Sequence, residues 1–136
     1  MKIPKIYCDI SLCVRHENTA SVSAQLDNMG LQYSIVSPMY FDEDLLKIAS
    51  VAPTELWYLD DALALLFQQI KNHVCQLKEM LHSLNVVAQL NIAFVQYGTY
   101  PALMITGENM RYIRELGADI SIDPYDAPSG EFAPAT

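Results

Sequence analysis

Three aspartates near the end of the chain raise the first chemical question. The stretch "IRELGADISIDPYD", residues 113–126, contains Asp119, Asp123 and Asp126. On a strand, Asp119 and Asp123 would lie about 13 Å apart, too far to share a metal ion or to act as an acid and base pair. Because strand side chains alternate, these two acids would point away from Ile120 and Ile122, and so away from the core. We therefore interpret the aspartates as surface residues.

A second group of acids lies in "FDEDLL", and the chain as a whole has a net charge of −8, with 16 acidic and 8 basic residues. This charge repels nucleic acid and anionic membranes and attracts cationic surfaces. It predicts a basic protein partner, although solubility alone also explains many acidic faces. The candidate partner-binding residues are Asp42, Glu43, Asp44, Asp119, Asp123 and Asp126.

Other side chains offer little chemistry at their spacing. Cys8 and Cys13 are separated by an odd number of residues, so on a strand they would face opposite ways and would not form a zinc pair. His73 and His82 fit an exposed helix face better than a metal site. The sequence has no glycine-rich phosphate loop, GxSxG elbow or HExxH motif. We expect no catalytic residues, no metal, no cofactor, and three buried reduced thiols.

The length of 136 residues predicts one domain over residues 1–127, followed by a flexible tail over 128–136. Half of the residues are hydrophobic, which predicts a packed core, and no apolar run approaches the roughly 20 residues of a membrane span. The opening "MKIPKIYCDISLC" carries Asp9 inside its apolar run, unlike a signal peptide. We expect a soluble cytoplasmic protein.

The first third of the chain predicts a strand, a helix, a short strand and an irregular segment. "KIYCDISLCV" alternates as a half-buried strand does, and "NTASVSAQLDNMGL" has helical spacing with Thr19 or Asn18 as cap and Gly30 as stop. "QYSIVSP" predicts a short strand. We interpret "YFDEDLLKIASVAP" as a loop that holds a helical turn from Asp42.

The longest predicted element is one helix over residues 60–85, with Asp60 or Asp61 as cap and Asn85 as stop. Its apolar stripe fits a helix laid on a sheet, with a coiled-coil dimer seam as the alternative. The stripe consists of Leu63, Phe67, Ile70, Val74, Leu77, Leu81 and Leu84.

The remaining segments predict a hairpin, a helix and a last strand. "VVAQLNIAFVQY" and "YPALMIT" have strand composition and meet at Gly98. Thr106 caps "GENMRYIREL", Gly117 stops it, and "ADISID" follows as a strand.

The two short helices share residues at one constant offset, which suggests two strand–helix–strand half-units flanking the long central helix. Duplication and convergence both explain the match. The fold class that follows is α+β, with a mostly antiparallel sheet and three helices on one face. The matched residues are Thr19, Leu26, Met29, Gly30, Ser34 and Ile35 with Thr106, Ile113, Leu116, Gly117, Ser121 and Ile122.

Two stretches, "LWYLDDALALLFQQI" and "PALMITGENMRYIRELGADISIDPY", resemble the bacterial family catalogued as domain of unknown function 4279. The similarity lies in a Trp-led strand before the long helix, here Trp57, and in a closing helix, Gly117 and strand that ends at Asp123 and Tyr125.

The first half of the chain is also similar to this family at Gly30 and Pro38, but lacks its downstream glycine around "MYFDEDLL". The resemblance implies a fold without a catalytic motif. Some members resemble immunity proteins encoded beside secreted bacterial toxins.

The charge and the resemblance together favour an immunity-type protein that neutralises a basic toxin by electrostatically steered binding. The alternative is a ligand- or peptide-binding regulatory domain with a pocket between sheet and helices, lined by Trp57, Tyr97 and Tyr100. An enzyme of unrecognised type is the third hypothesis.

Overall fold

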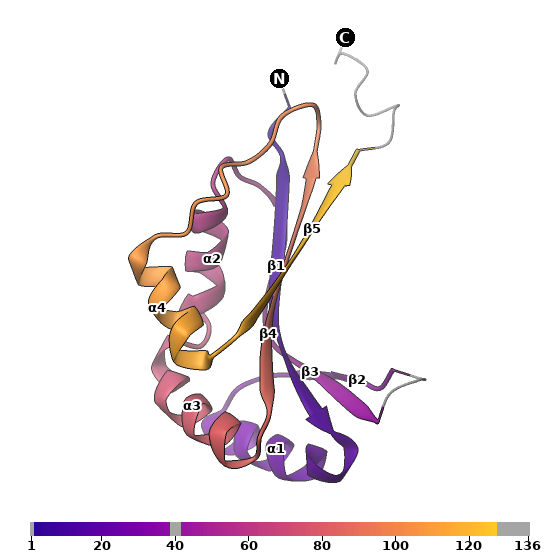
Figure 1. The fold of residues 1–136 in the computed structure, drawn as a ribbon, viewed down its shortest axis with the longest axis vertical. Coiled ribbons are helices and arrows are strands. Elements are labelled where there is room, and N and C mark those ends of the chain that lie inside the picture. The colour runs from indigo at the N-terminus through magenta and orange to yellow at the C-terminus, as the bar shows by residue number, and fades with distance from the viewer. Residues whose placement is uncertain (1, 39–41, 128–136) are drawn as a thin grey trace.

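The computed structural model describes residues 2–38 and 42–127, and its framework is a five-stranded sheet (Figure 1). The strands are β1 (Lys5–Arg15), β2 (Ser34–Val36), β3 (Glu43–Glu55), β4 (Val87–Gln96) and β5 (Asp119–Asp126). Their order across the sheet is β2-β3-β1-β4-β5, so β1 is central and β2 and β5 form the edges. The β4–β5 pair is parallel and the other pairs are antiparallel. The predicted tail over 128–136 lies outside the described residues.

The helices gather on one face of this sheet, as Figure 1 shows. They are α1 (His16–Met29), α2 (Leu59–Gln68), α3 (Val74–Ser83) and α4 (Gly107–Leu116), with a 3-10 turn, η1 (Lys71–His73), between α2 and α3. While α1 and α2 contact the strands, α4 packs mainly on α2 and α3. No helix within the described ranges is long and apolar enough to cross a membrane.

The predicted α+β class is confirmed, with two differences in detail. The sheet is mixed, because β5 joins it parallel to β4. The described residues form four α-helices rather than three, because the predicted long helix is interrupted.

The interruption lies at residues 69–73, where hydrogen bonds tighten from the α to the 3-10 pattern. The Ile70 N–H donates to the Phe67 carbonyl at 3.1 Å and the His73 N–H to the Ile70 carbonyl at 2.8 Å. The Gln69 side chain leaves the helix surface and bonds both the N–H and the carbonyl of Ser50 on β3, at 3.1 and 2.7 Å. The prediction of one continuous helix was wrong because no proline or glycine in the sequence marks this break.

The segment predicted as a loop around residues 42–53 is the long strand β3. It pairs with β1 along its length, from Arg15 opposite Glu43 to Lys5 opposite Glu55. The acids at its start have low strand propensity, which concealed the alternation of the residues that follow. Pairing with β1 outweighs this local preference.

The predicted hairpin at Gly98 was also wrong. Gly98 does have a positive φ of 83°, but residues 97–106 form no strand beyond a single bridge between Ala102 and Tyr58. The two sides of β4 are already occupied by β1 and β5, so no position remains for a hairpin partner. The strand that the family resemblance implies at Trp57 is likewise absent, since β3 ends at Glu55.

One hydrophobic core joins the sheet to the helices. Alternate residues of the central strands contribute to it, so the predicted half-buried pattern of β1 is confirmed. The predicted helix stripe is confirmed as core at six of its seven residues, each at most 9% exposed, and Leu84 is half-buried. The six are Leu63, Phe67, Ile70, Val74, Leu77 and Leu81. The break at residues 69–73 therefore preserves the buried face.

Two glycines end helices as predicted. Gly30 and Gly117 have φ of 75° and 58°, the left-handed conformation that glycine adopts at low cost. After each glycine the next N–H bonds back to the helix, from Leu31 to Leu26 at 3.1 Å and from Ala118 to Ile113 at 3.1 Å. The residues that match between the two short helices therefore include the same type of helix end in both.

The two half-units have the same strand directions. In the first unit, β1–α1–β2, the strands β1 and β2 run parallel to each other and β3 lies between them. In the second unit, β4–α4–β5, the strands β4 and β5 also run parallel but pair directly. The matched threonines Thr19 and Thr106 each donate a hydroxyl hydrogen bond to an aspartate of another element, to Asp44 at 2.5 Å and to Asp60 at 2.8 Å.

Candidate functional site

The face of the sheet opposite the helices, here called the open face, is the candidate site (Figure 1). It receives the side chains that alternate with the core residues, and the strand registers align them in rows across β3, β1, β4 and β5. One row runs from Lys47 through Ser11 and Gln89 to Asp119. The prediction that Asp119 and Asp123 point away from the helices agrees with this register.

A hydrogen-bonded polar cluster occupies the middle of the open face. The Asp9 carboxylate accepts hydrogen bonds from the Ser11 hydroxyl at 3.1 Å and from the Asn91 amide at 2.8 Å. The Lys47 ammonium lies 3.9 Å from its other oxygen. These contacts connect β1 with β3 and β4 through the Asp9 carboxylate. The carboxylate is partly exposed, so it also places a negative charge at the middle of the open face.

The acidic end of the open face combines residues from both predicted acid groups. Arg15, Glu17, Asp42 and Glu43 line a hollow of about 400 Å³ at the point where β1 ends and β3 begins. The Cys13 thiol lies next to this end, and its pKa is raised by burial and by the negative charges of Glu43 and of Asp119. Glu43 and Asp119, far apart in sequence, therefore act on the same side chain.

Asp123 and Asp126 lie farther along β5 and differ from each other in orientation. The register places Tyr7, Ala93 and Asp123 in one row, so Asp123 lies on the open face with Tyr7. Burial raises the pKa of the Tyr7 hydroxyl, and Tyr125 and Asp123 raise it further. Asp126, three residues beyond Asp123, falls on the other side by strand alternation, and its carboxylate accepts a hydrogen bond from the Gln96 amide.

Asp44 does not join the surface acids, because its side chain points toward the helices and is buried, with the residue 5% exposed. It accepts hydrogen bonds from the hydroxyls of Thr19 and Ser37 at 2.5 and 2.7 Å, and the His16 Nδ1 lies 3.0 Å from it. Thr19, Ser37 and His16 together lower the pKa of Asp44, although burial opposes them. Asp44 therefore joins α1 to the β2–β3 edge and is not available for a surface contact.

This buried group resembles a catalytic triad in composition only. The Ser37 hydroxyl donates its proton to the Asp44 carboxylate, whereas in a Ser–His–Asp triad that proton goes to the imidazole. Across residues 2–38 and 42–127, no three His, Cys, Asp or Glu side chains cluster in a way that could hold a metal ion.

The three cysteines are free, but only Cys8 is buried as predicted. Its pKa is raised to about 12, first by burial and then by Asp9. Cys13 is half-buried on the opposite face of β1, and Cys75 is exposed on α3. A thiol as protonated as that of Cys8 is a poor nucleophile.

The predicted aromatic pocket between the sheet and the helices does not have the expected form. Trp57 is 37% exposed and Tyr100 is 65% exposed, and Tyr100 contacts Phe94 edge-on with ring centroids 6.3 Å apart. Tyr97 lies under the Lys2 ammonium, which is 4.8 Å from the ring centroid.

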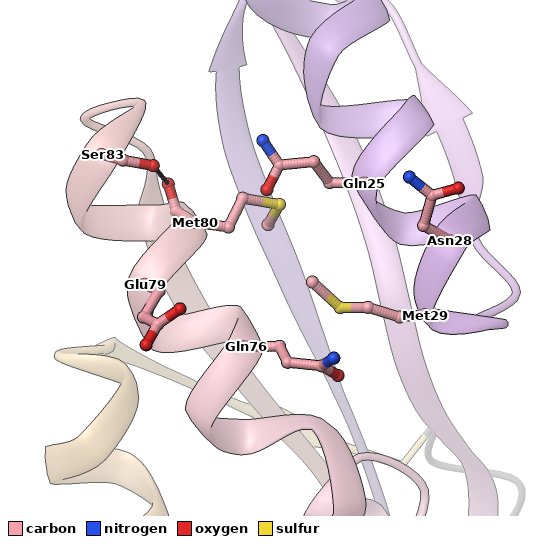
Figure 2. Close-up of a pocket in the computed structure, with 7 residues that line it drawn as sticks. All are labelled: Gln25, Asn28, Met29, Gln76, Glu79, Met80 and Ser83. Atoms are coloured by element: carbon pink, nitrogen blue, oxygen red, sulfur yellow. Dashed lines mark hydrogen bonds between the residues drawn. The ribbon is translucent and has the colours of Figure 1, made fainter.

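A groove that the sequence did not reveal lies between α1 and α3, with a volume of about 410 Å³. Figure 2 shows Met29 and Met80 pointing into it from the two helices, with the amides of Gln25 and Gln76 at its sides. The remaining lining residues are Asn28, Glu79 and Ser83.

The sequence interpretation also missed the polar cluster around Asp9 and the hollow beside Glu17. The alternation of "KIYCDISLCV" contained a signal for the first, because Tyr7, Asp9, Ser11 and Cys13 had to share the face opposite the core. The contact of Lys47 with Asp9 depended on the register of β3, which the loop prediction excluded.

In comparisons with protein-family models, with curated proteins and with solved structures, nothing matches this chain.

Proposed function

We propose that the protein binds a basic partner protein through the open face and its acidic end, and that it acts by covering the functional surface of that partner. The observation that carries this proposal is that the described helices all lie on one face of the sheet, so that none of them covers the surface acids of the other face. Of the six predicted contact residues, Asp42, Glu43, Asp119 and Asp123 belong to this surface.

Charge supports this proposal in two ways. A net charge of −8 accelerates the encounter with a cationic protein, and acids near the docking patch orient it. The polar cluster of Asp9, Ser11 and Asn91 then supplies a fixed hydrogen-bonding centre, already ordered before the partner arrives.

The class of partner that we propose is a toxin domain with a basic active cleft, which makes this chain an immunity-type protein. The resemblance of "PALMITGENMRYIRELGADISIDPY" to a family with immunity-like members supports this choice. Occlusion needs no catalytic residue in the inhibitor, only a complementary surface that excludes the substrate of the toxin.

The test uses the product of the neighbouring open reading frame, expressed with and without this chain. We expect co-purification of the two proteins and protection of growth by the unaltered chain. The variant Asp42→Lys/Glu43→Lys/Asp119→Lys/Asp123→Lys should lose both effects. The control variant Asp27→Lys/Asp61→Lys/Glu108→Lys/Glu115→Lys reverses the same number of acids on α1, α2 and α4, outside the open face and outside the lining of the α1–α3 groove, and should retain them. Equal loss in both variants, with folding intact by circular dichroism, would contradict binding through the open face.

The groove between α1 and α3 favours a second function, the binding of a small apolar ligand or peptide. Met29 and Met80 provide an adaptable apolar floor, and the amides around it provide hydrogen bonds (Figure 2). Met29→Arg would fill this groove with a charged side chain. If the groove is the functional site, this variant should lose ligand binding or protection while the open-face variants retain it.

A further inference from the structure

Within residues 2–38 and 42–127, no strand pairs with the outer edge of β5. β5 is the last strand of the sheet, and every residue of it is exposed except Ser121, which is half-buried. The opposite edge strand, β2, has three residues, which limits its capacity to pair with another chain. The eight-residue edge of β5 offers a longer template.

The hydrogen bonds of β5 show which of its backbone groups face this free edge. Just beyond the strand, the Ala127 N–H donates to the Gln96 carbonyl of β4 at 3.0 Å. Because alternate residues of a strand bond to opposite sides, the odd-numbered residues face β4 and the even-numbered residues face outward. The N–H and C=O groups of Ile120 and Ile122 therefore point to the free edge.

Pro124 fits this assignment and sets the length of the edge. It is even-numbered, so its missing N–H falls on the unpaired side, where a proline does not disturb the ladder with β4. In the part of β5 that precedes Pro124, the backbone N–H groups that point to the free edge are those of Ile120 and Ile122. An added strand would thus centre on the first half of β5.

An apolar surface accompanies these backbone groups on the side of the helices. Ile120 and Ile122 are 43% and 45% exposed there, because α4 packs on α2 and α3 instead of over β5. A groove of about 580 Å³ lies just before the start of β5, where Met110, Ile113 and Ala118 line it together with Arg111 and Arg114. Two exposed isoleucines on one strand are costly in water unless another surface covers them.

The other face of β5 determines the charge of the chain that would fit. Asp119 and Asp123 flank Ser121 on the open face, beside the row of Asn91 and Asp9. A second copy of this protein would bring its own aspartates close to these, which disfavours self-pairing. A strand with basic residues at alternate positions would neutralise them.

We infer that β5 accepts an added strand from its partner, and that this strand alternates apolar with basic residues. Its apolar side chains would lie beside Ile120 and Ile122, and its lysines or arginines beside Asp119 and Asp123. The inference rests on the proposed function for the charge of the partner. The docking position follows from β5 itself.

The test uses the full chain and a fluorescent peptide, KVKVKV, with EVEVEV as its charge control. We expect KVKVKV to bind at least tenfold more tightly than EVEVEV. Ile122→Pro, which removes an outward N–H without altering the pairing with β4, should weaken binding tenfold or more relative to Ile122→Val. N-methylation of alternate peptide bonds, which leaves the protein unchanged, should have the same effect.

Four outcomes would overturn the inference. These are no binding of KVKVKV at millimolar concentration, equal binding of EVEVEV, unchanged binding after N-methylation, and a dimer of the full chain that Ile122→Pro dissociates. The last outcome would make a second copy the occupant. If Ile122→Pro retains the partner of the neighbouring reading frame while the open-face charge reversal loses it, the proposed function stands and strand addition does not.

Discussion

The two strand–helix–strand units of this fold use the same local structure but differ in their edges. Both helices end at a left-handed glycine, Gly30 or Gly117, and both carry a threonine bonded to an aspartate. The first unit takes β3 between its strands and ends in the three-residue β2, while the second pairs β4 directly with the longer β5. Local sequence thus determines the helix ends, whereas the pairing of the strands differs between the two units.

A second difference concerns the helices. α1 packs on β1 and β3, whereas α4 packs on α2 and α3, with Tyr112 stacked on Phe67 at 5.1 Å between ring centroids. The helix side of β5 therefore remains exposed. Both edge strands nonetheless expose apolar side chains, Ile35 and Val36 on β2 and Ile120 and Ile122 on β5. The two edges therefore differ in length, three residues against eight, rather than in protection.

The largest expected effect comes from the core that the two units share. Ile70 is fully buried where α2 meets the 3-10 turn, so Ile70→Asp would bury an unpaired charge and should unfold the protein, at a cost of more than about 4 kcal/mol. Ile70→Val should cost only about 1 kcal/mol. Urea denaturation followed by circular dichroism measures both. A cooperatively folded Ile70→Asp monomer would show that the core is not common to both units.

The equivalence of the two helix ends can be tested at their glycines. A Cβ at Gly30 or at Gly117 meets nothing within 4 Å, so substitution is penalised by the backbone conformation alone. Gly30→Val and Gly117→Val should each lower the free energy of unfolding by roughly 1–2 kcal/mol, and by similar amounts.

Gly107 provides the matched control for these variants. It also has open space around its Cα but begins α4 without a positive φ, so Gly107→Ala should be neutral or stabilising. Chemical denaturation measures all three variants. A penalty at one helix end alone would break the proposed equivalence.

A smaller effect is expected from the two aspartates that anchor the threonines. Burial is the largest single influence on the pKa of Asp60 and raises it, but hydrogen bonds from the N–H and hydroxyl of Thr106 and from Asn109 together lower this pKa below its usual value. The pKa of Asp44 is lowered in the same direction, foremost by the Thr19 hydroxyl. Both carboxylates thus stabilise the fold above their unfolded pKa of about 4, and this stability is lost as the pH falls through the lower folded values.

We therefore expect the free energy of unfolding to decrease on acidification below about pH 4, and Asp44→Asn or Asp60→Asn to reduce this dependence. Thermal unfolding between pH 2.5 and 7 measures it. An unchanged pH slope in both variants would show that these carboxylates do not anchor the two units.

The local structure of the chain could be predicted from its sequence more fully than the way in which its elements pack together. The glycine stops, the buried helix stripe and the alternation of β1 follow from short-range patterns. The break at Gln69 and strand β3 do not, because the Gln69 bonds to Ser50 and the pairing of β3 with β1 connect distant segments.

The candidate site was partly predictable for the same reason. Asp119 and Asp123 face away from the helices as strand alternation predicted. Asp44 is buried, because the register of β3 turns it toward Thr19 and Ser37. Strand β3 brings Asp42 and Glu43 to the same end of the open face as Glu17 and Asp119. The sequence pattern predicted a loop in place of this strand, so the proximity of these acids could not be predicted.

The association rate of the protein with the product of the neighbouring open reading frame tests the proposed binding surface most directly. It should be measured by stopped-flow fluorescence between 20 and 500 mM salt, for the unaltered chain, for Asp42→Lys/Glu43→Lys/Asp119→Lys/Asp123→Lys and for the helix-side control with the same charge change, Asp27→Lys/Asp61→Lys/Glu108→Lys/Glu115→Lys. Steering by the open face predicts a rate at low salt about tenfold or more lower in the first variant than in the control, with a weaker salt dependence. Equal rates and equal salt slopes in the two variants would contradict the open face as the docking surface.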